Sequence, residues 1–343
     1  MSVPANSTLP SSMATRPWRQ RLLAVAGLAV TAVFLALIWT RIDPARVVAA
    51  LSRVSWTALA VAAALLAGAY TAKITRWHVM LTSVAPSVSW STAAQTLLAS
   101  VALNNVLPFR AGDVARVFAF RDRLAIPASA LVPMLVLERI LDAGMLLILA
   151  GLVAIPAGSQ LFPKHLGSLS ALGAVAVLGI VAVAVAAGPG AQALTPYGTT
   201  ALSWLPTAVR QPASQALDVL ARQLRGWQGA KLALLSALAW GLEGGMLAAL
   251  ATGFGFSRPI LAGYFSCALA TLATLIPSSP GFFGTFHAAA IAAVEVFGAS
   301  PDQAAAYAIL AHGIMWAPLT LLGLACLAWL SAHRLLTPAA ETP

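Results

Sequence analysis

The chain has 343 residues, of which 60% are hydrophobic and 9% charged, and its net charge is +10. A soluble domain contains about 25% charged residues, so this composition excludes a soluble core and predicts an all-α, polytopic membrane protein. The basic residues flank apolar runs, which favours a role in topology and contact with anionic lipid over nucleic-acid binding.

The first segments alternate apolar runs with short polar connections. Residues 1–15 are rich in Ser, Thr and Pro and are expected to be disordered, and residues 22–39 form the first predicted span. Asp43 and Pro44 have the pattern of a helix start, which predicts a short interfacial helix. Residues 56–72 form a second span. Basic and aromatic side chains follow it, which we interpret as an interface anchor: Lys73, Arg76 and Trp77.

An apolar run then leads into a polar segment at residues 104–116, broken by Pro108 and Gly112. Within a membrane, broken backbone persists only where protein or a water-filled cavity satisfies its N–H and C=O groups. This segment is therefore the first candidate functional site. Asn104 and Asn105 are expected to cap backbone groups at the break.

The following segments carry charge inside apolar runs. Residues 128–155 form a long span that contains Glu138, Arg139 and Asp142. Residues 170–187 form an uncharged span, and an amphipathic helix follows before residue 230. Residues 232–254 span again, with Glu243 near the centre.

A second break interrupts the last third of the chain. Residues 261–276 are apolar and run into a Pro- and Gly-rich segment, and residues 303–330 form the last span, which contains His312. The residues of this second helix break are Pro277, Pro280, Gly281 and Gly284. The two glycines supply a tight turn and close helix approach.

The two breaks share the spacing P-x-x-x-G and similar surroundings, which predicts an internal repeat over about residues 20–157 and 168–332. Each half would contain three spans and one re-entrant element, so the halves would be inverted. This predicts about six spans and two re-entrant hairpins, with about eight spans as the alternative. Residues 16–332 would form one transmembrane domain, and residues 333–343 a cytoplasmic tail.

Orientation follows from the arginines. If residues 92–126 dip into the membrane and return, the arginines at and after the first break lie in the cytoplasm, together with both termini. The loop at residues 40–55 is a misfit, because it carries three arginines and would face outward.

Insertion of a charged group at mid-membrane costs about 2.5–3.5 kcal/mol, so these residues are expected to have a functional or structural role. One interpretation is a polar cavity that binds a lipid headgroup; the other is a salt-bridge network that fixes the broken helix. The candidate residues are Asn104, Arg110, Asp113, Arg116, Glu138, Arg139, Asp142, Glu243 and His312. Exchange of Arg110 or Arg116 for Gln is expected to impair lipid handling more than folding.

Soluble-enzyme motifs are absent from the sequence: it has no G-x-S-x-G, P-loop or H-E-x-x-H pattern, and no Cys/His metal spacing. We therefore expect no enzymatic activity, no metal and no cofactor. An intramembrane enzyme is the weakest alternative, and it predicts that Glu138→Gln abolishes product formation while lipid binding persists.

The sequence LPFRAGDVAR at residues 107–116, followed by LERILD at 137–142, resembles the transmembrane region of the lysylphosphatidylglycerol synthase family. The sequence IPSSPGFFG at 276–284 is similar to that family's second marker. The resemblance implies a flippase-like membrane region. The residues that it places on charged positions of the family are Arg110, Asp113, Arg116, Glu138, Arg139 and Asp142. Asp113 departs from the more usual Glu. Since the chain ends at residue 343, we do not expect the aminoacyltransferase activity.

The leading hypothesis is a protein of the bacterial inner membrane that binds and flips an amphiphilic lipid through a path between the two breaks. The lipid would be anionic, aminoacylated, glycosylated or polycyclic. The alternative is a non-transporting partner that presents lipid to a separately encoded lipid-modifying enzyme.

Overall fold

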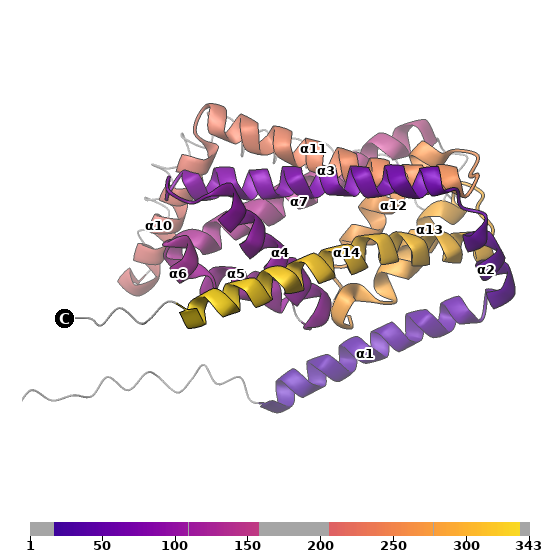
Figure 1. The fold of residues 1–343 in the computed structure, drawn as a ribbon, viewed down its shortest axis with the longest axis horizontal. Helices are drawn as coiled ribbons and strands as arrows, with labels where there is room; N and C mark the ends of the chain where they lie inside the picture. The colour runs from indigo at the N-terminus through magenta and orange to yellow at the C-terminus, as the bar shows by residue number, and fades with distance from the viewer. Residues whose placement is uncertain (1–16, 109, 158–205, 277, 337–343) are drawn as a thin grey trace, which may run out of the picture.

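The computed structural model describes residues 17–108, 110–157, 206–276 and 278–336, and all regular elements in this part of the chain are helices. The predicted all-α, polytopic architecture is therefore confirmed. Long helices run the length of the molecule (Figure 1): α3 (Trp56–Thr82), α11 (Trp227–Gly253) and α14 (Pro301–Leu336).

Within the described residues, α3, α11 and α14 are long and apolar enough to cross a membrane. Helix α1 (Pro17–Trp39) meets α2 (Pro44–Ser52) at a bend of 85°. Helix α7 (Ala128–Ala157) has 30 residues but contains the charged residues Glu138, Arg139 and Asp142. The span expected at residues 170–187, the tail at 1–15 and residues 337–343 lie outside the described part, so the number of spans stays a prediction.

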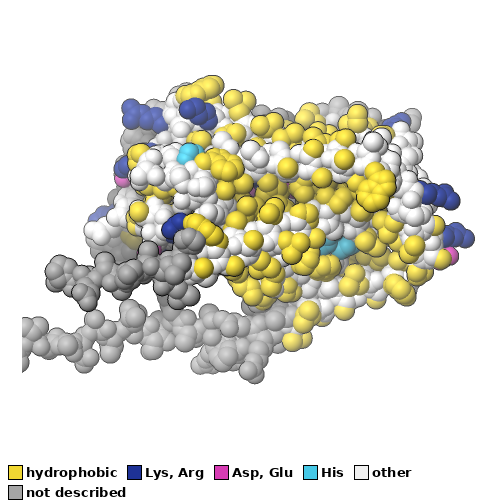
Figure 2. Space-filling view, viewed as in Figure 1, with side chains coloured by type: hydrophobic (Ala, Val, Ile, Leu, Met, Phe, Trp, Pro, Cys, Tyr) yellow, Lys and Arg dark blue, Asp and Glu magenta, His cyan; other side chains and the backbone are white. Residues whose placement is uncertain are grey.

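Hydrophobic side chains cover the middle of the face shown in Figure 2, and Lys and Arg gather toward its two ends. This distribution is the one expected of a protein that crosses a bilayer. Small residues let the helices approach closely: Gly263 of α12 (Pro259–Ala273) lies against the backbone of α11 at Ala248, and Gly323 of α14 lies against Leu98 of α4 (Trp90–Val106).

Both amphipathic segments form helices, as expected. Asp43 caps α2, because its side chain accepts a hydrogen bond from the backbone N–H of Ala45 at 2.9 Å. Helix α10 (Thr207–Leu224) is the second such element. The two helices lie at opposite ends of the molecule (Figure 1), as an inverted repeat requires.

The two broken elements have matching parts. Helix α4 (Trp90–Val106) breaks and continues as α5 (Ala111–Phe118), and the four-residue α6 (Arg121–Leu124) follows. Helix α12 (Pro259–Ala273) breaks and continues as α13 (Thr285–Glu295). Both α4 and α12 are shorter than the about 20 residues that cross a bilayer.

Contacts between helices follow the same pairing in each half. Helix α4 packs on α14 while α12 packs on α7, and α2 packs on α14 while α10 packs on α7. Helices α3 and α11, which are equivalent in the two halves, pack against each other. Each broken element thus lies on the long helix of the other half. This exchange supports the predicted repeat, and its orientation in the membrane stays a prediction.

The predicted interface anchor after residue 72 is wrong. Helix α3 continues to Thr82, and Arg76 and Trp77 are each only 1% exposed. Trp39 and Trp56, at 67% and 85% exposure, do have the exposure expected of an interface belt. The charges of Lys73 and Arg76 are compensated there by carboxylates of α11 and α7, because Lys73 pairs with Glu243 and Arg76 pairs with Asp142.

Candidate functional site

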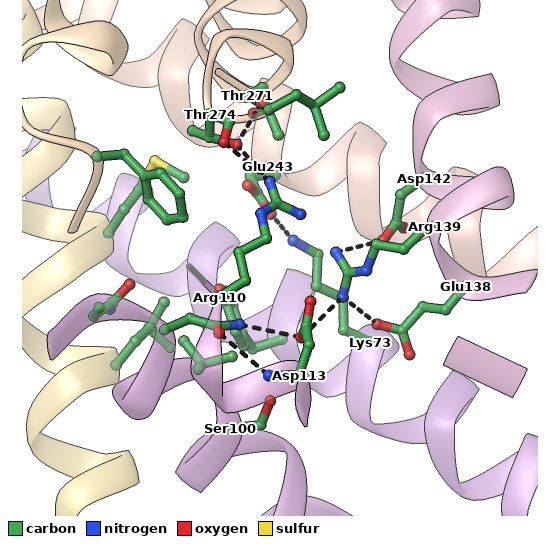
Figure 3. Close-up of a pocket in the computed structure, with 18 of the residues that line it drawn as sticks. Lys73, Ser100, Arg110, Asp113, Glu138, Arg139, Asp142, Glu243, Thr271 and Thr274 are labelled. Atoms are coloured by element: carbon green, nitrogen blue, oxygen red, sulfur yellow. Dashed lines mark hydrogen bonds and ion pairs between the residues drawn. The ribbon is translucent and has the colours of Figure 1, made fainter. Parts of the chain in front are cut away.

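A cavity of about 250 Å³ lies where the two helix breaks approach each other. Residues of α3, α4, α5, α7, α11, α12 and α14 line it, and several are drawn in Figure 3. All the polar candidates predicted from the sequence are among the lining residues: Asn104, Arg110, Asp113, Arg116, Glu138, Arg139, Asp142, Glu243 and His312.

The first break positions its charged residues through Asn104. Its side-chain oxygen accepts a hydrogen bond from the backbone N–H of Asp113 at 3.2 Å, and its amide donates to the Asp113 carboxylate at 3.1 Å. This fastens the start of α5 to the end of α4, as the predicted backbone capping requires. Asn105 instead donates to the hydroxyl of Thr320 on α14 at 2.8 Å.

Gly112 permits the close approach of α4 and α5 at this break. A Cβ at this position would collide with the carbonyl oxygen of Ser100 and lie 2.8 Å from the side-chain oxygen of Asn104. Pro108 lies between the two helices, where its missing N–H costs no helical hydrogen bond.

The second break forms a tight 3-10 turn, Pro280–Phe282, in which Gly281 has φ +71°. A Cβ on Gly281 would lie 3.2 Å from the carbonyl oxygen of Asn105, so the two breaks are in direct contact. Thr31 of α1 stabilises this turn through two hydrogen bonds. Its hydroxyl donates to the carbonyl of Phe283 at 3.0 Å and accepts from the N–H of Ser279 at 3.1 Å. Pro277 lies outside the described residues, and Gly284 has φ +87° next to Thr31.

Glu138 is the centre of an ion-pair network that joins α5 to α7. Arg116 donates to both of its carboxylate oxygens at 3.1 Å, and Arg139 donates to one of them at 2.8 Å. Arg139 also forms an ion pair of 3.7 Å with Asp113. Figure 3 shows how these side chains lie around the cavity. The Arg116 guanidinium stacks over the ring of Trp77 at 4.7 Å.

Asp142, one turn further along α7, joins the network to α3 and α11. Arg76 donates to it at 2.7 Å and to the hydroxyl of Ser236 at 2.8 Å, while the indole N–H of Trp240 donates at 2.9 Å. Arg139 lies 3.6 Å from its second oxygen. Asp142 is therefore surrounded by donors from separate helices.

Lys73 and Glu243 form a second ion pair on the α3–α11 side of the cavity. The Lys73 ammonium lies 4.2 Å from the ring centroid of Trp240 and 4.9 Å from that of Tyr70. A carboxylate and two aromatic faces thus enclose this ammonium, which is a favourable arrangement for a desolvated cation.

Arg110 differs from the other cations. It has φ +52° at the start of α5 and reaches across to α12, where it donates to the hydroxyl of Thr274 at 3.1 Å and to its carbonyl at 3.3 Å. Its guanidinium lies 5.6 Å from the ring centroid of Phe282. Within the described residues, no carboxylate lies within ion-pairing distance of Arg110.

His312 lies apart from the charged network, at the second break. Its Nδ1 is 3.4 Å from Nε2 of His287 on α13, and the rings of Phe283 and Phe286 pack on it at 4.7 and 4.9 Å. Both histidines are buried. In the described part of the chain, no three His, Cys, Asp or Glu side chains are arranged as a metal site.

Lys73, Arg76 and Trp240 are cavity residues that sequence reasoning missed. The available signal was a shortage of counter-charge within the predicted spans, which contain the carboxylates Glu138, Asp142 and Glu243 but only one cation, Arg139. A helix that continues past Ala72 would have brought Lys73 and Arg76 to mid-membrane on neighbouring turns.

Comparison with known proteins supports the resemblance seen in the motifs. The family model described as "Lysylphosphatidylglycerol synthase TM region" matches residues 24–323. The curated protein "Glycosyltransferase AglD" of Haloferax volcanii is 23% identical over 328 residues, which cover 86% of this chain and 52% of that protein. The chain thus spans about half the length of this relative.

The expectation that the chain has no enzymatic activity is contradicted, because this relative is named as a glycosyltransferase. The expectation depended on missing motifs of soluble enzymes. The absence of such motifs says nothing about chemistry at a membrane-embedded site. Enzymatic activity is therefore no longer excluded.

Proposed function

Because this chain belongs to the family of the lysylphosphatidylglycerol synthase TM region, we propose that it binds the headgroup of an amphiphilic lipid in the cavity and moves it between leaflets. The observation that carries the proposal is the polar cavity at the meeting point of two broken helices, inside a bundle with an apolar exterior. Broken helices that meet near mid-membrane are typical of transporters. The cavity has room for a headgroup, while acyl chains would stay in the bilayer.

We place the chain in the bacterial inner membrane with both termini in the cytoplasm. Helices α6 and α10, which carry several arginines, lie toward the same end of the molecule as the end of α14 (Figure 1). At the opposite end, two of the three arginines of residues 40–55 have acidic partners, since Arg41 lies 3.4 Å from Glu295 and Arg46 lies 3.5 Å from Asp43. These pairs do not remove the misfit of the loop at residues 40–55, because orientation follows the number of Lys and Arg residues rather than net charge.

The test is lipid movement in liposomes that contain the purified protein. Fluorescent anionic, aminoacylated, glycosylated and polycyclic lipids are placed in one leaflet and followed with a membrane-impermeant quencher. Thr271→Trp, which fills the cavity from α12, should slow movement, whereas Ile260→Trp on the exposed face of the same helix should not. If no lipid of any class moves faster than in protein-free liposomes, the proposal is wrong.

A second function is favoured by the comparisons: the chain could present lipid to an enzyme without moving it across the membrane. The family description and the relative's name both refer to enzymes, and the chain matches only 52% of that relative. This alternative predicts lipid binding without lipid movement. It also predicts that a separately encoded lipid-modifying enzyme works faster when the chain is present.

A further inference from the structure

The described residues that line the cavity include one more positive than negative side chain. Its charged lining residues are five cations, Lys73, Arg76, Arg110, Arg116 and Arg139, and four carboxylates, Asp113, Glu138, Asp142 and Glu243. Five minus four leaves an excess of one positive charge. Outside the described residues, the sequence has a single acidic residue, Glu341, close to its end.

The excess charge is located on Arg110. Each of the other cations lies within ion-pairing distance of a carboxylate, whereas the described contacts of Arg110 are a hydroxyl, a carbonyl and a ring. The described hydrogen bonds engage its Nη2 alone. A partly buried guanidinium without an anion is unfavourable, and a phosphate diester is a matching partner because guanidinium N–H groups can bind two of its oxygens together.

Among the described residues that line the cavity, no carboxylate is left for a substrate ammonium. Glu243 is held by Lys73, Glu138 by Arg116, and Asp142 by Arg76. The fourth, Asp113, accepts hydrogen bonds from Asn104 and Arg116. The rings of Tyr70 and Trp240, which could bind an ammonium through their faces, already enclose that of Lys73.

We propose, on the basis of the proposed function, that the cavity selects lipids with one phosphate diester and an otherwise uncharged polar headgroup, and discriminates against headgroups that carry ammonium. Glycerol and sugar headgroups are of the favoured kind, and Ser100 and Thr271 line the cavity with hydroxyls that can bind theirs. A lysyl ester of phosphatidylglycerol, with two ammonium groups and one phosphate, would add positive charge to a cavity that already has an excess.

The test measures binding separately from movement. The full chain in detergent is mixed with phosphatidylglycerol, phosphatidylethanolamine and lysylphosphatidylglycerol of identical acyl chains, and bound lipid is quantified by native mass spectrometry. Phosphatidylglycerol should bind at least about tenfold more tightly than either amine-bearing lipid. Equal binding, or a preference for an amine, overturns the proposal. Absence of lipid movement with this preference intact would overturn the proposed function alone.

Variants locate the selectivity on Arg110. Arg110→Gln should remove most of the preference and Arg110→Lys should keep part of it, whereas Arg121→Gln, on the exposed α6, should leave it unchanged. A preference that persists in Arg110→Gln overturns the assignment. Glycerol phosphate and inorganic phosphate are added as competitors: displacement of the lipid only at large excess supports a lipid site, and displacement at equal concentration means that the site takes free phosphate.

Discussion

Arg116 and Arg110 lie six residues apart, yet they should respond differently to exchange for Gln. Arg116 is only 2% exposed and makes two hydrogen bonds of 3.1 Å to Glu138. Removal of one member of a buried ion pair costs about 3–5 kcal/mol, because the other charge is left buried without compensation. Arg139 still donates to Glu138, so we expect a value near the lower limit for Arg116→Gln.

Arg110→Gln should cost less, about 1.5 kcal/mol, the lower limit for a hydrogen bond of a charged group, because it loses contacts with Thr274 but removes a charge without a counter-ion among the described residues and leaves no carboxylate there unpaired. The double variant Arg116→Gln/Glu138→Gln should recover much of the stability of the single variant, since both charges are removed together. Thermal unfolding of the purified variants in one detergent, followed by Trp fluorescence, measures these differences.

Two results would refute this reasoning. Equal destabilisation by Arg110→Gln and Arg116→Gln would mean that the ion pair with Glu138 contributes nothing specific to folding. Strict additivity of the two exchanges in the double variant would mean that Arg116 and Glu138 are not coupled. The sequence predicts that exchange of either arginine affects lipid handling more than folding. Because Arg116 pairs with buried Glu138 and Arg110 pairs with no carboxylate of the described residues, we now expect this of Arg110 alone.

Three further predictions follow from other contacts. Gly323→Ala should lower the unfolding temperature, because a Cβ there collides with the backbone of α4, and overpacking costs about 1–3 kcal/mol; Gly313→Ala on the same helix, with no neighbour within 4 Å, should leave it equal or higher. Glu243→Gln should destabilise the protein in the same melting assay by leaving the Lys73 ammonium unpaired, and addition of Lys73→Met should restore stability. Thr31→Val should free the turn at the second break, measured as faster hydrogen exchange at residues 279–284, with unchanged exchange in α3 as the control.

Local signals explain why both helix breaks and the charges of α7 were predictable. Pro108, Gly112 and Gly281 interrupt apolar runs, and Glu138 and Asp142 stand within one, so a single stretch of sequence reveals each anomaly. All of these residues lie at the cavity except Pro108 and Gly112, which shape the break beside it.

The partners of these charges were not predictable in the same way. Arg76 follows an apolar run, and a basic residue in that position is more often an interface anchor. Its burial depends on α3 packing against α11 and on Asp142 approaching from α7, which are contacts between distant segments. The different roles of Arg110 and Arg116 likewise depend on the left-handed backbone at Arg110, which turns its side chain toward α12.

The exchange of broken elements between halves has a consequence for biosynthesis. When residues 17–157 have left the ribosome, α4 has not yet met α14, and α7 has not yet met α12. At that stage the residues that will line the cavity include five cations but only three carboxylates, because Glu243 has not yet been synthesised. The insertion machinery must therefore hold the first half, with its excess of positive charge, until the second half has been synthesised. If synthesis stops before α11, the first half should be a substrate for membrane quality control.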